Sequence, residues 1–356
     1  MWFNNKKNIL ITGAKGQLGS YLVKELTKES FKQSSKIGQV FGIDIDDLDL
    51  TDSFAVADFF NRHVVDPSVK IDYVVHCAAA TNTAAIEKDP LKFYAANVIG
   101  TKNVAESCAY NKIKMIHIST DYVFSELSPD GCGGDKIEFP VNQYGMHKLL
   151  AEKEAQLAYM RWGHIERLTI GRLSWLFGNS QNSFVEKFLR SSFKTYVNAR
   201  NSGQHEEDVF QKVVDDAYGK PTPVWLVLGY VLDVICNSKS GTFDFQYNAC
   251  NQISRFEWAT MILNSFYKML ERSFWPKETD DKITSLAADM QAHLKVIAVK
   301  SSELNIGMQH PGLVDRHSSI SSSDVIDSYV KCTEEYIKNN AERLIDMMKN
   351  ELKEVK

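Results

Sequence analysis

Apolar and polar positions alternate in a regular way through the first half of the chain. Short apolar runs predict buried strands at residues 9–12, 40–43, 73–76, 114–118 and 165–170. Apolar side chains at helical spacing predict helices between them, at residues 17–27, 53–63, 90–110 and 142–160. This alternation is typical of parallel strands with helices on both faces, so we expect a doubly wound α/β fold.

The pattern changes after residue 172. It predicts further helices at residues 182–192, 224–235, 255–270 and 324–351, and one strand at 242–247. We expect a sheet domain over residues 1–171, to which residues 224–250 return. The remaining segments, residues 172–223 and 251–323, are expected to form a smaller mixed α/β lobe, and residues 324–356 a C-terminal helix.

The first predicted strand leads directly into the sequence GAKGQLG, whose glycines are Gly13, Gly16 and Gly19. A strand, a tight turn and a helix in this order expose backbone N–H groups at a helix N-terminus, where phosphate binds well. The spacing differs from the simplest dinucleotide-binding pattern, and a glycine-rich turn without a ligand is the alternative. The ends of the neighbouring strands bear on this choice.

Residues that could contact a dinucleotide follow each of the next three predicted strands. Asp44 follows the second, where a carboxylate can accept hydrogen bonds from ribose hydroxyls and favours NAD over a 2′-phosphate; a solvated loop acid is the alternative. Ala78, Ala79 and Ala80 follow the third, and their small side chains allow a ligand to approach the backbone. Together with residues 119–122 after the fourth, they predict a dinucleotide site at the carboxyl ends of the strands.

The segment YGMHK carries the candidate chemistry. Tyr144 and Lys148 are four residues apart and therefore share one face of the predicted helix. An ammonium beside a phenol lowers the phenol's pKa, so the pair can move a proton to or from a substrate oxygen. Thr120, at the end of the fourth strand, can donate a second hydrogen bond to that oxygen. The alternative is an ordinary exposed helix pair.

Composition excludes several classes of function. The chain has 356 residues, a net charge of −4 and no basic block, so we expect no nucleic-acid partner. The longest apolar run, residues 224–235, is too short to span a bilayer, which needs roughly 20 residues. The six cysteines form no metal-ligand spacing, so we expect no metal. The N-terminal residues lack a signal-peptide pattern, and we expect a cytoplasmic protein.

The motifs GAKGQLG, STDYVF and YGMHK together resemble the extended short-chain dehydrogenase/reductase family. More narrowly, they are similar to its dTDP-4-dehydrorhamnose reductases, a family of sugar-nucleotide reductases. Further stretches fit the same pattern, in order: LDLTD, HCAAAT, YAANVIGT, GRLSWLFG and VVDDAYGKPT. The resemblance covers roughly residues 8–250 and implies a Rossmann-type doubly wound parallel sheet with a smaller substrate-binding lobe.

The resemblance also implies roles for single residues. The pyrophosphate would lie on Gly13, Gly16, Gln17 and Leu18. The adenosine would meet Asp44, Asp49 and Leu50, and the cofactor would also be lined by Ala78, Ala79 and Ala80. The catalytic residues would be Thr120, Tyr144 and Lys148, of which the last two would also hold the cofactor, and the sugar nucleotide would contact Thr120, Tyr122, Trp175 and Asn182.

The implied reaction is reduction of a nucleotide-linked 4-keto-6-deoxy sugar by NADH or NADPH, with NADH favoured by Asp44. Related dehydratases carry Thr-Asp-Glu where this chain has Thr120, Asp121 and Tyr122, which disfavours elimination of water. Many family members have a glutamate where this chain has Tyr21, and that glutamate is associated with a magnesium-bridged dimer. Tyr21 therefore argues against both the metal and that dimer, although a homodimer stays possible.

Two alternatives stay open. The first is an epimerase or another nucleotide-sugar enzyme of the same superfamily. The second is a catalytically silent nucleotide-binding subunit, because a regulatory subunit of methionine adenosyltransferase resembles the same reductases. The intact set of Thr120, Tyr144 and Lys148 argues against a silent subunit.

Overall fold

The computed structural model describes residues 6–34, 36–65, 70–127, 138–178, 183–203, 208–246, 252–271, 281–304, 312–313 and 323–354. Its central feature is a six-stranded parallel sheet, with strand order β11-β6-β4-β3-β1-β2. The strands are β1 (Lys7–Thr12), β2 (Ile37–Ile43), β3 (Tyr73–His76), β4 (Lys114–Thr120), β6 (Leu168–Leu173) and β11 (Gly241–Asp244). After β1 the chain adds β2 on one side of β1 and then crosses to the other side, where it adds β3 and the remaining strands. In such sheets this switch point is where ligands bind.

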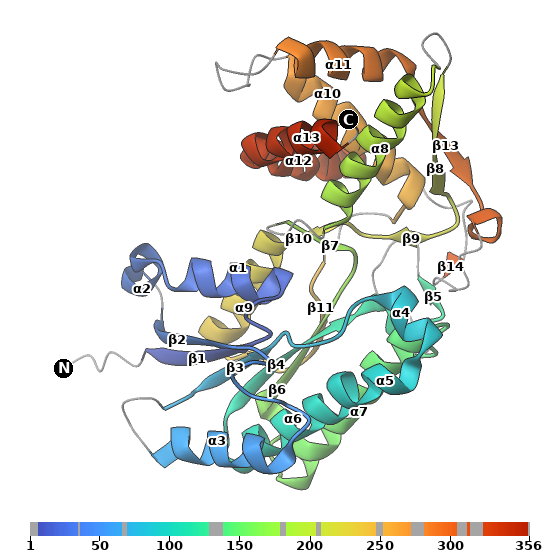
Figure 1. The fold of residues 1–356 in the computed structure, drawn as a ribbon. Coiled ribbons are helices and arrows are strands. Elements are labelled where there is room, and N and C mark those ends of the chain that lie inside the picture. The colour runs from blue at the N-terminus through green and yellow to red at the C-terminus, as the bar shows by residue number, and fades with distance from the viewer. Residues whose placement is uncertain are drawn as a thin grey trace.

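Helices cover both faces of the sheet (Figure 1). One face packs on α1 (Gln17–Leu26) and α9 (Val224–Asn237), the other on α3 (Ser53–Val65), α6 (Gly100–Tyr110) and α7 (Gln143–Arg161). Successive strand side chains point to opposite faces, and the cores divide accordingly: Ile9 and Ile11 lie in one, Leu10 in the other. Both faces are buried, which explains the continuous apolar runs of the strands.

Short helices connect these elements. They are α2 (Glu29–Ser34), α4 (Thr83–Lys88) and α5 (Pro90–Tyr94), and α5 joins α6 through a π-helical turn, Ala95–Ile99. A 3₁₀ turn, Asp121–Val123, follows β4, and another, Ile165–Arg167, precedes β6.

A second group of helices lies beyond the end of the sheet, above it in Figure 1. Its members are α8 (Phe184–Asn201), α10 (Arg255–Glu271), α11 (Asp281–His293), α12 (Ser323–Asn339) and α13 (Ala341–Glu354). They share a separate apolar core with the parallel pair β8 (Val209–Val214) and β13 (Leu294–Val299). The sheet and this mixed lobe confirm the predicted fold class.

Three further strand pairs connect the two parts. They are β7 (Leu176–Phe177) with β10 (Thr222–Pro223), β9 (Tyr218–Gly219) with β12 (Ile253–Ser254), and β5 (Glu126–Leu127) with β14 (Gly312–Leu313).

Several predicted element boundaries were wrong. The fifth strand, expected from residue 165, begins at Leu168 because residues 165–167 form the 3₁₀ turn. The helix expected at 182–192 continues to Asn201. The single helix expected at 324–351 is two helices, which meet at Asn340; the side-chain amide of Asn340 donates to Tyr336 O at 2.7 Å. The helix α11 and the strands β8 and β13 were not predicted.

Candidate active site

The sheet register brings the strand ends to a common level. Thr12 pairs with Ile43 on one side and with His76 on the other, and His76 pairs with His117. The residues that follow these positions therefore emerge at one edge of the sheet. They line two adjoining cavities that share Gly13, Gly16, Cys77 and Ala79.

The glycine loop forms the junction of the two cavities. Gly13 has a φ of +67°, and a Cβ on it would lie 2.8 Å from the backbone of Ala78, so a larger residue would be both strained and obstructed. The helix α1 begins directly after Gly16 with no side-chain cap. Its first backbone N–H groups are thus available to an anion, and Gly16, Gln17 and Leu18 line the adjoining cavity.

The first cavity, of about 330 Å³, extends from the loop toward β2 and is lined by Asp44, Asp49, Leu50 and Ala78. The Asp44 carboxylate accepts hydrogen bonds from the backbone N–H groups of Lys15 (2.8 Å) and Ile45 (2.9 Å). These bonds hold it at the mouth of the cavity. Lys15 also lines the cavity, and its ammonium forms an ion pair with Asp46.

The alanine segment after β3 is hydrogen-bonded to the π-helical turn. Asn97, fully buried, donates to the carbonyl of Ala80 at 3.1 Å and accepts from its N–H at 2.7 Å. Ala78 and Ala79 line the cavities, whereas Ala80 lines neither. Sequence reasoning missed Asn97, although an asparagine inside an otherwise apolar helix face is a visible signal.

The second cavity, of about 430 Å³, contains the proposed chemistry. Its lining includes Thr120, Tyr122, Tyr144 and Lys148 from the sheet side, and Trp175 from the segment after β6. Asn182 lies outside the described residues. The structure thus gathers the other predicted catalytic and substrate-contacting residues around one space next to the glycine loop.

The helix α7 carries Tyr144 in its first turn. Asn142 caps this helix by accepting from the N–H of Gly145 at 2.8 Å. A Cβ on Gly145 would lie 2.1 Å from Tyr122 O, so the absent side chain is what allows the helix to approach the 3₁₀ turn after β4. The rings of Tyr122 and Tyr144 meet edge to face, with centroids 6.1 Å apart.

Burial raises the pKa of Tyr144, and the nearby Tyr122 and Asp121 add to the shift. The expectation that Lys148 lowers this pKa is wrong for this structure. The Lys148 ammonium instead donates to Ile118 O at 2.7 Å and lies 3.3 Å from His117 Nε2. Desolvation therefore dominates at Tyr144, and the phenol stays protonated at neutral pH.

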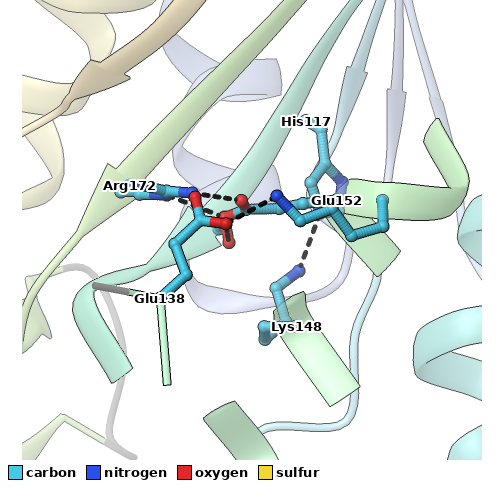
Figure 2. A network of polar contacts seen from close by, with 7 residues as sticks. His117, Glu138, Lys148, Glu152 and Arg172 are labelled. Carbon is cyan, nitrogen blue, oxygen red and sulfur yellow. Dashed lines mark hydrogen bonds and ion pairs between the residues drawn. The ribbon is translucent and has the colours of Figure 1, made fainter. Parts of the chain in front are cut away.

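Lys148 is itself buried, and burial lowers its pKa to about 8. The nearby Glu152 charge opposes that shift. Figure 2 shows Arg172 pointing at Glu152 and Glu138, and Lys148 pointing at His117. Arg172 Nε donates to Glu152 Oε1 at 3.0 Å, which fixes this carboxylate near the lysine.

The residues between β4 and α7 are held by local hydrogen bonds. Thr120 Oγ1 accepts from the N–H of Tyr122 at 3.3 Å and donates to Asp121 Oδ1 at 3.2 Å. Burial raises the pKa of Asp121 to about 6, while hydrogen bonds from Ser174 and Thr120 oppose the shift.

Arg255 is a further lining residue that sequence reasoning missed. It is the first residue of α10, and the sequence offered only the start of an amphipathic helix there. Its guanidinium lies 3.7 Å from the centroid of the Trp175 ring. No signal in the sequence connects these two residues, which are far apart along the chain.

Within the described ranges, no three His, Cys, Asp or Glu side chains are grouped so as to hold a metal ion. No helix in that part of the chain is both long and apolar enough to cross a membrane.

Comparison with known families gives one match over most of the chain. Residues 7–304 match the family model described as RmlD substrate binding domain. The chain belongs to this family. The predicted resemblance to the extended short-chain dehydrogenase/reductases is thereby confirmed.

Individual relatives of this family are similar over shorter segments. A dTDP-4-keto-6-deoxy-D-glucose reductase of Streptomyces niveus is 29% identical over 66% of this chain and 70% of that protein. A dTDP-4-dehydrorhamnose reductase of Mycolicibacterium smegmatis is 30% identical over 64% of this chain and 60% of that protein. The chain thus matches 60–70% of the length of these two relatives.

A solved structure shares the fold over nearly the whole chain. It is a dTDP-4-dehydrorhamnose reductase of Bacillus anthracis, in complex with NADP, with a TM-score of 0.67 and 24% identity. The similarity covers 93% of this chain and 99% of that one. The lobe beyond the sheet is therefore part of the shared architecture.

Proposed function

We propose that this chain reduces the 4-keto group of a nucleotide-linked 4-keto-6-deoxyhexose, with NADH or NADPH as the hydride donor. One observation supports this most: Thr120, Tyr144 and Lys148 line a cavity that continues directly into the glycine-loop cleft. Family membership agrees with it, because both curated relatives are named as reductases of dTDP-linked 4-keto-6-deoxy sugars.

The residues present fit a nicotinamide dinucleotide. Gly13 leaves no side chain between the loop and β3, and the uncapped start of α1 offers N–H groups to a pyrophosphate. The adenosine would occupy the cavity of Asp44, Asp49 and Leu50. When bound, the nicotinamide would supply the hydride for the carbonyl carbon.

Tyr144 is proposed as the proton donor to the substrate oxygen. Burial raises the pKa of its phenol, which therefore holds a proton until negative charge develops on the oxygen during reduction. Thr120 would donate a second hydrogen bond to the same oxygen by turning its hydroxyl hydrogen from Asp121 Oδ1 to the substrate. The Lys148 ammonium, next to the cavity, would stabilise the negative charge that Tyr144 carries after giving up its proton.

Tyr122 argues against a dehydratase. Burial raises the pKa of its phenol, so at neutral pH it offers no base to remove a proton from the sugar. We therefore expect reduction without elimination of water.

The direct test is a panel of dTDP-, UDP- and GDP-linked 4-keto-6-deoxy sugars, with oxidation of NADH and NADPH followed by absorbance. Tyr144→Phe should lower kcat about 10²–10⁴-fold, because the variant keeps the ring and loses the proton. Tyr110→Phe, which changes an exposed ring on α6, is the matched control and should retain full activity. Cofactor binding without oxidation by any sugar would instead favour a silent nucleotide-binding subunit.

Asp44 is proposed to favour NADH. Its carboxylate lies where a ribose would bind, and it would repel a 2′-phosphate. We expect Asp44→Asn to shift the ratio of kcat/KM for NADPH to that for NADH upward about tenfold, roughly 1.4 kcal/mol. An unchanged ratio would remove Asp44 from cofactor selection.

A further inference from the structure

Among the described residues that line the second cavity, two charged side chains have no role in the proposed mechanism, Arg255 and the buried Asp121. Arg255 reaches the cavity from the lobe, at the start of α10, whereas Tyr144 and Lys148 reach it from α7. An arginine in this position brings a permanent positive charge to the substrate side of the cleft.

The guanidinium lies over three aromatic rings. Its Cζ lies 3.7 Å from the centroid of Trp175, 4.5 Å from that of Phe184 and 5.4 Å from that of Trp258. Stacking of this kind restricts a guanidinium to one plane while its edge stays free to donate hydrogen bonds.

The aromatic rings next to Arg255 are closely packed. Trp175 stacks on Trp258 with centroids 5.7 Å apart, and a Cβ on Gly219 would lie 2.4 Å from the Trp175 indole, so only glycine leaves room for this ring. Trp175 also has a φ of +37°, in the left-handed region that large residues rarely adopt. Backbone strain of this kind occurs most often at ligand sites.

One donor of this guanidinium is unused. Nη1 of Arg255 is buried and has no hydrogen-bond partner among the residues that the structure describes. Burial lowers the pKa of Arg255 to about 10, so the group is still charged at neutral pH. Its neighbour Tyr122 is hydrogen-bonded to the guanidinium and is neutral there, because burial raises the pKa of the phenol, and the nearby Asp121 carboxylate partly opposes the shift of the arginine. A buried charge with an unused donor is costly unless a ligand supplies the acceptor.

The chemistry of the substrate identifies the acceptor, and this step rests on the proposed function. A 4-keto-6-deoxyhexose has no charge, so the fixed negative charge of the molecule lies on its diphosphate. The diphosphate is attached at carbon 1, across the sugar ring from the carbonyl that Tyr144 would meet. With the carbonyl at Tyr144, it would extend toward the lobe side of the cavity.

We propose that Arg255, oriented by Trp175 and Phe184, binds the diphosphate of the nucleotide sugar through paired hydrogen bonds. Planar guanidinium groups recognise phosphate oxygens in this two-point manner. Trp175 then acts on the substrate at least in part through Arg255, as a positioning residue.

Calorimetric titration of thymidine diphosphate and of thymidine into the NADH-loaded protein tests this proposal. Arg255→Met should weaken binding of the diphosphate about 10- to 100-fold, since charge-assisted hydrogen bonds are lost, and leave binding of thymidine unchanged. Arg255→Lys should bind the diphosphate more tightly than Arg255→Met and less tightly than the wild type. In turnover, Arg255→Met should raise KM by a similar factor with little change in kcat.

The matched control is Lys187→Met, which removes the same charge from the exposed face of α8. Unchanged thermal unfolding and NADH binding in Arg255→Met would show that this variant folds normally. Equal affinity for thymidine diphosphate in wild type and Arg255→Met would overturn the proposal, as would a wild type that binds the diphosphate no better than thymidine. Diphosphate binding that depends on Arg255 in a protein that reduces no sugar would support this inference while refuting the proposed function.

Discussion

At the scale of single residues, burial shifts the pKa values of Tyr144, the proposed proton donor, and of Lys148, its proposed charge partner, in opposite directions. It raises the pKa of Tyr144 and lowers that of Lys148 to about 8. The phenol therefore keeps its proton throughout the neutral range, and the ammonium is the group whose charge changes near it. Activity should depend on pH through Lys148.

The expected pH profile follows from the lowered pKa of Lys148. The ammonium is charged below pH 8 and loses its proton as the pH rises through about 8, so kcat/KM should fall above this point. This decrease is distinct from any change near pH 6, where the pKa of Asp121 in the same cavity lies. Steady-state kinetics across the neutral and alkaline range measures this decrease, the alkaline limb of the profile. A profile that stays level through the alkaline range would contradict a role for the Lys148 charge.

Glu152 provides a sharper version of the same test. Its charge raises the pKa of Lys148, so Glu152→Gln should move the alkaline limb to lower pH. Glu154→Gln is the matched control, because Glu154 lies two residues along the same helix and pairs with Lys102 on the surface. If kcat/KM falls at the same pH in both variants, Glu152 does not act on Lys148.

At the scale of elements, the buried pair of Glu152 and Arg172 joins α7 to β6. Glu152 is fully buried, and Arg172 meets it through two hydrogen bonds, of 3.0 and 2.5 Å. Ser119 Oγ on β4 donates to the same carboxylate at 2.5 Å. The helix that carries Tyr144 is thereby tied to two strands of the sheet (Figure 2).

Removal of Arg172 should be strongly destabilising, because it leaves a buried carboxylate without its counter-charge. We expect Arg172→Met to lower the free energy of unfolding by about 3–5 kcal/mol in urea titration. Arg62→Met, which breaks the exposed pair with Asp58, should cost at most about 1 kcal/mol. Similar decreases in the free energy of unfolding in the two variants would show that the buried pair contributes no more to stability than the exposed one.

Sequence patterns predicted the elements of the sheet because their signals are local. A strand buried on both faces is a continuous apolar run, and the glycine loop follows from the needs of one tight turn. The continuation of α8 was also visible: Val185, Leu189, Phe193 and Val197 are buried at four-residue spacing. By contrast, β8 pairs with β13, about 85 residues away, and no local pattern reveals such a partner.

At the scale of the whole molecule, the site lies between the edge of the sheet and the lobe. Sequence reasoning predicted the sheet side of the cavity, because its residues follow strands whose ends must meet. It could not predict the lobe side, where Phe184 and Arg255 depend on how α8 and α10 pack. Trp175 was expected near the sugar, and the structure adds the arginine stacked on it.

Transfer of deuterium from the cofactor tests the central claim of ketoreduction most directly. With a nucleotide-linked 4-keto-6-deoxy sugar and NADH or NADPH labelled at the transferred position, we expect one deuterium at carbon 4 of the product by mass spectrometry and NMR. With unlabelled cofactor in D₂O, carbon 4 should stay unlabelled, because the proton from Tyr144 goes to oxygen and exchanges. A product without deuterium from the cofactor, or carbon labelling from D₂O without net cofactor oxidation, would contradict reduction and favour an epimerase.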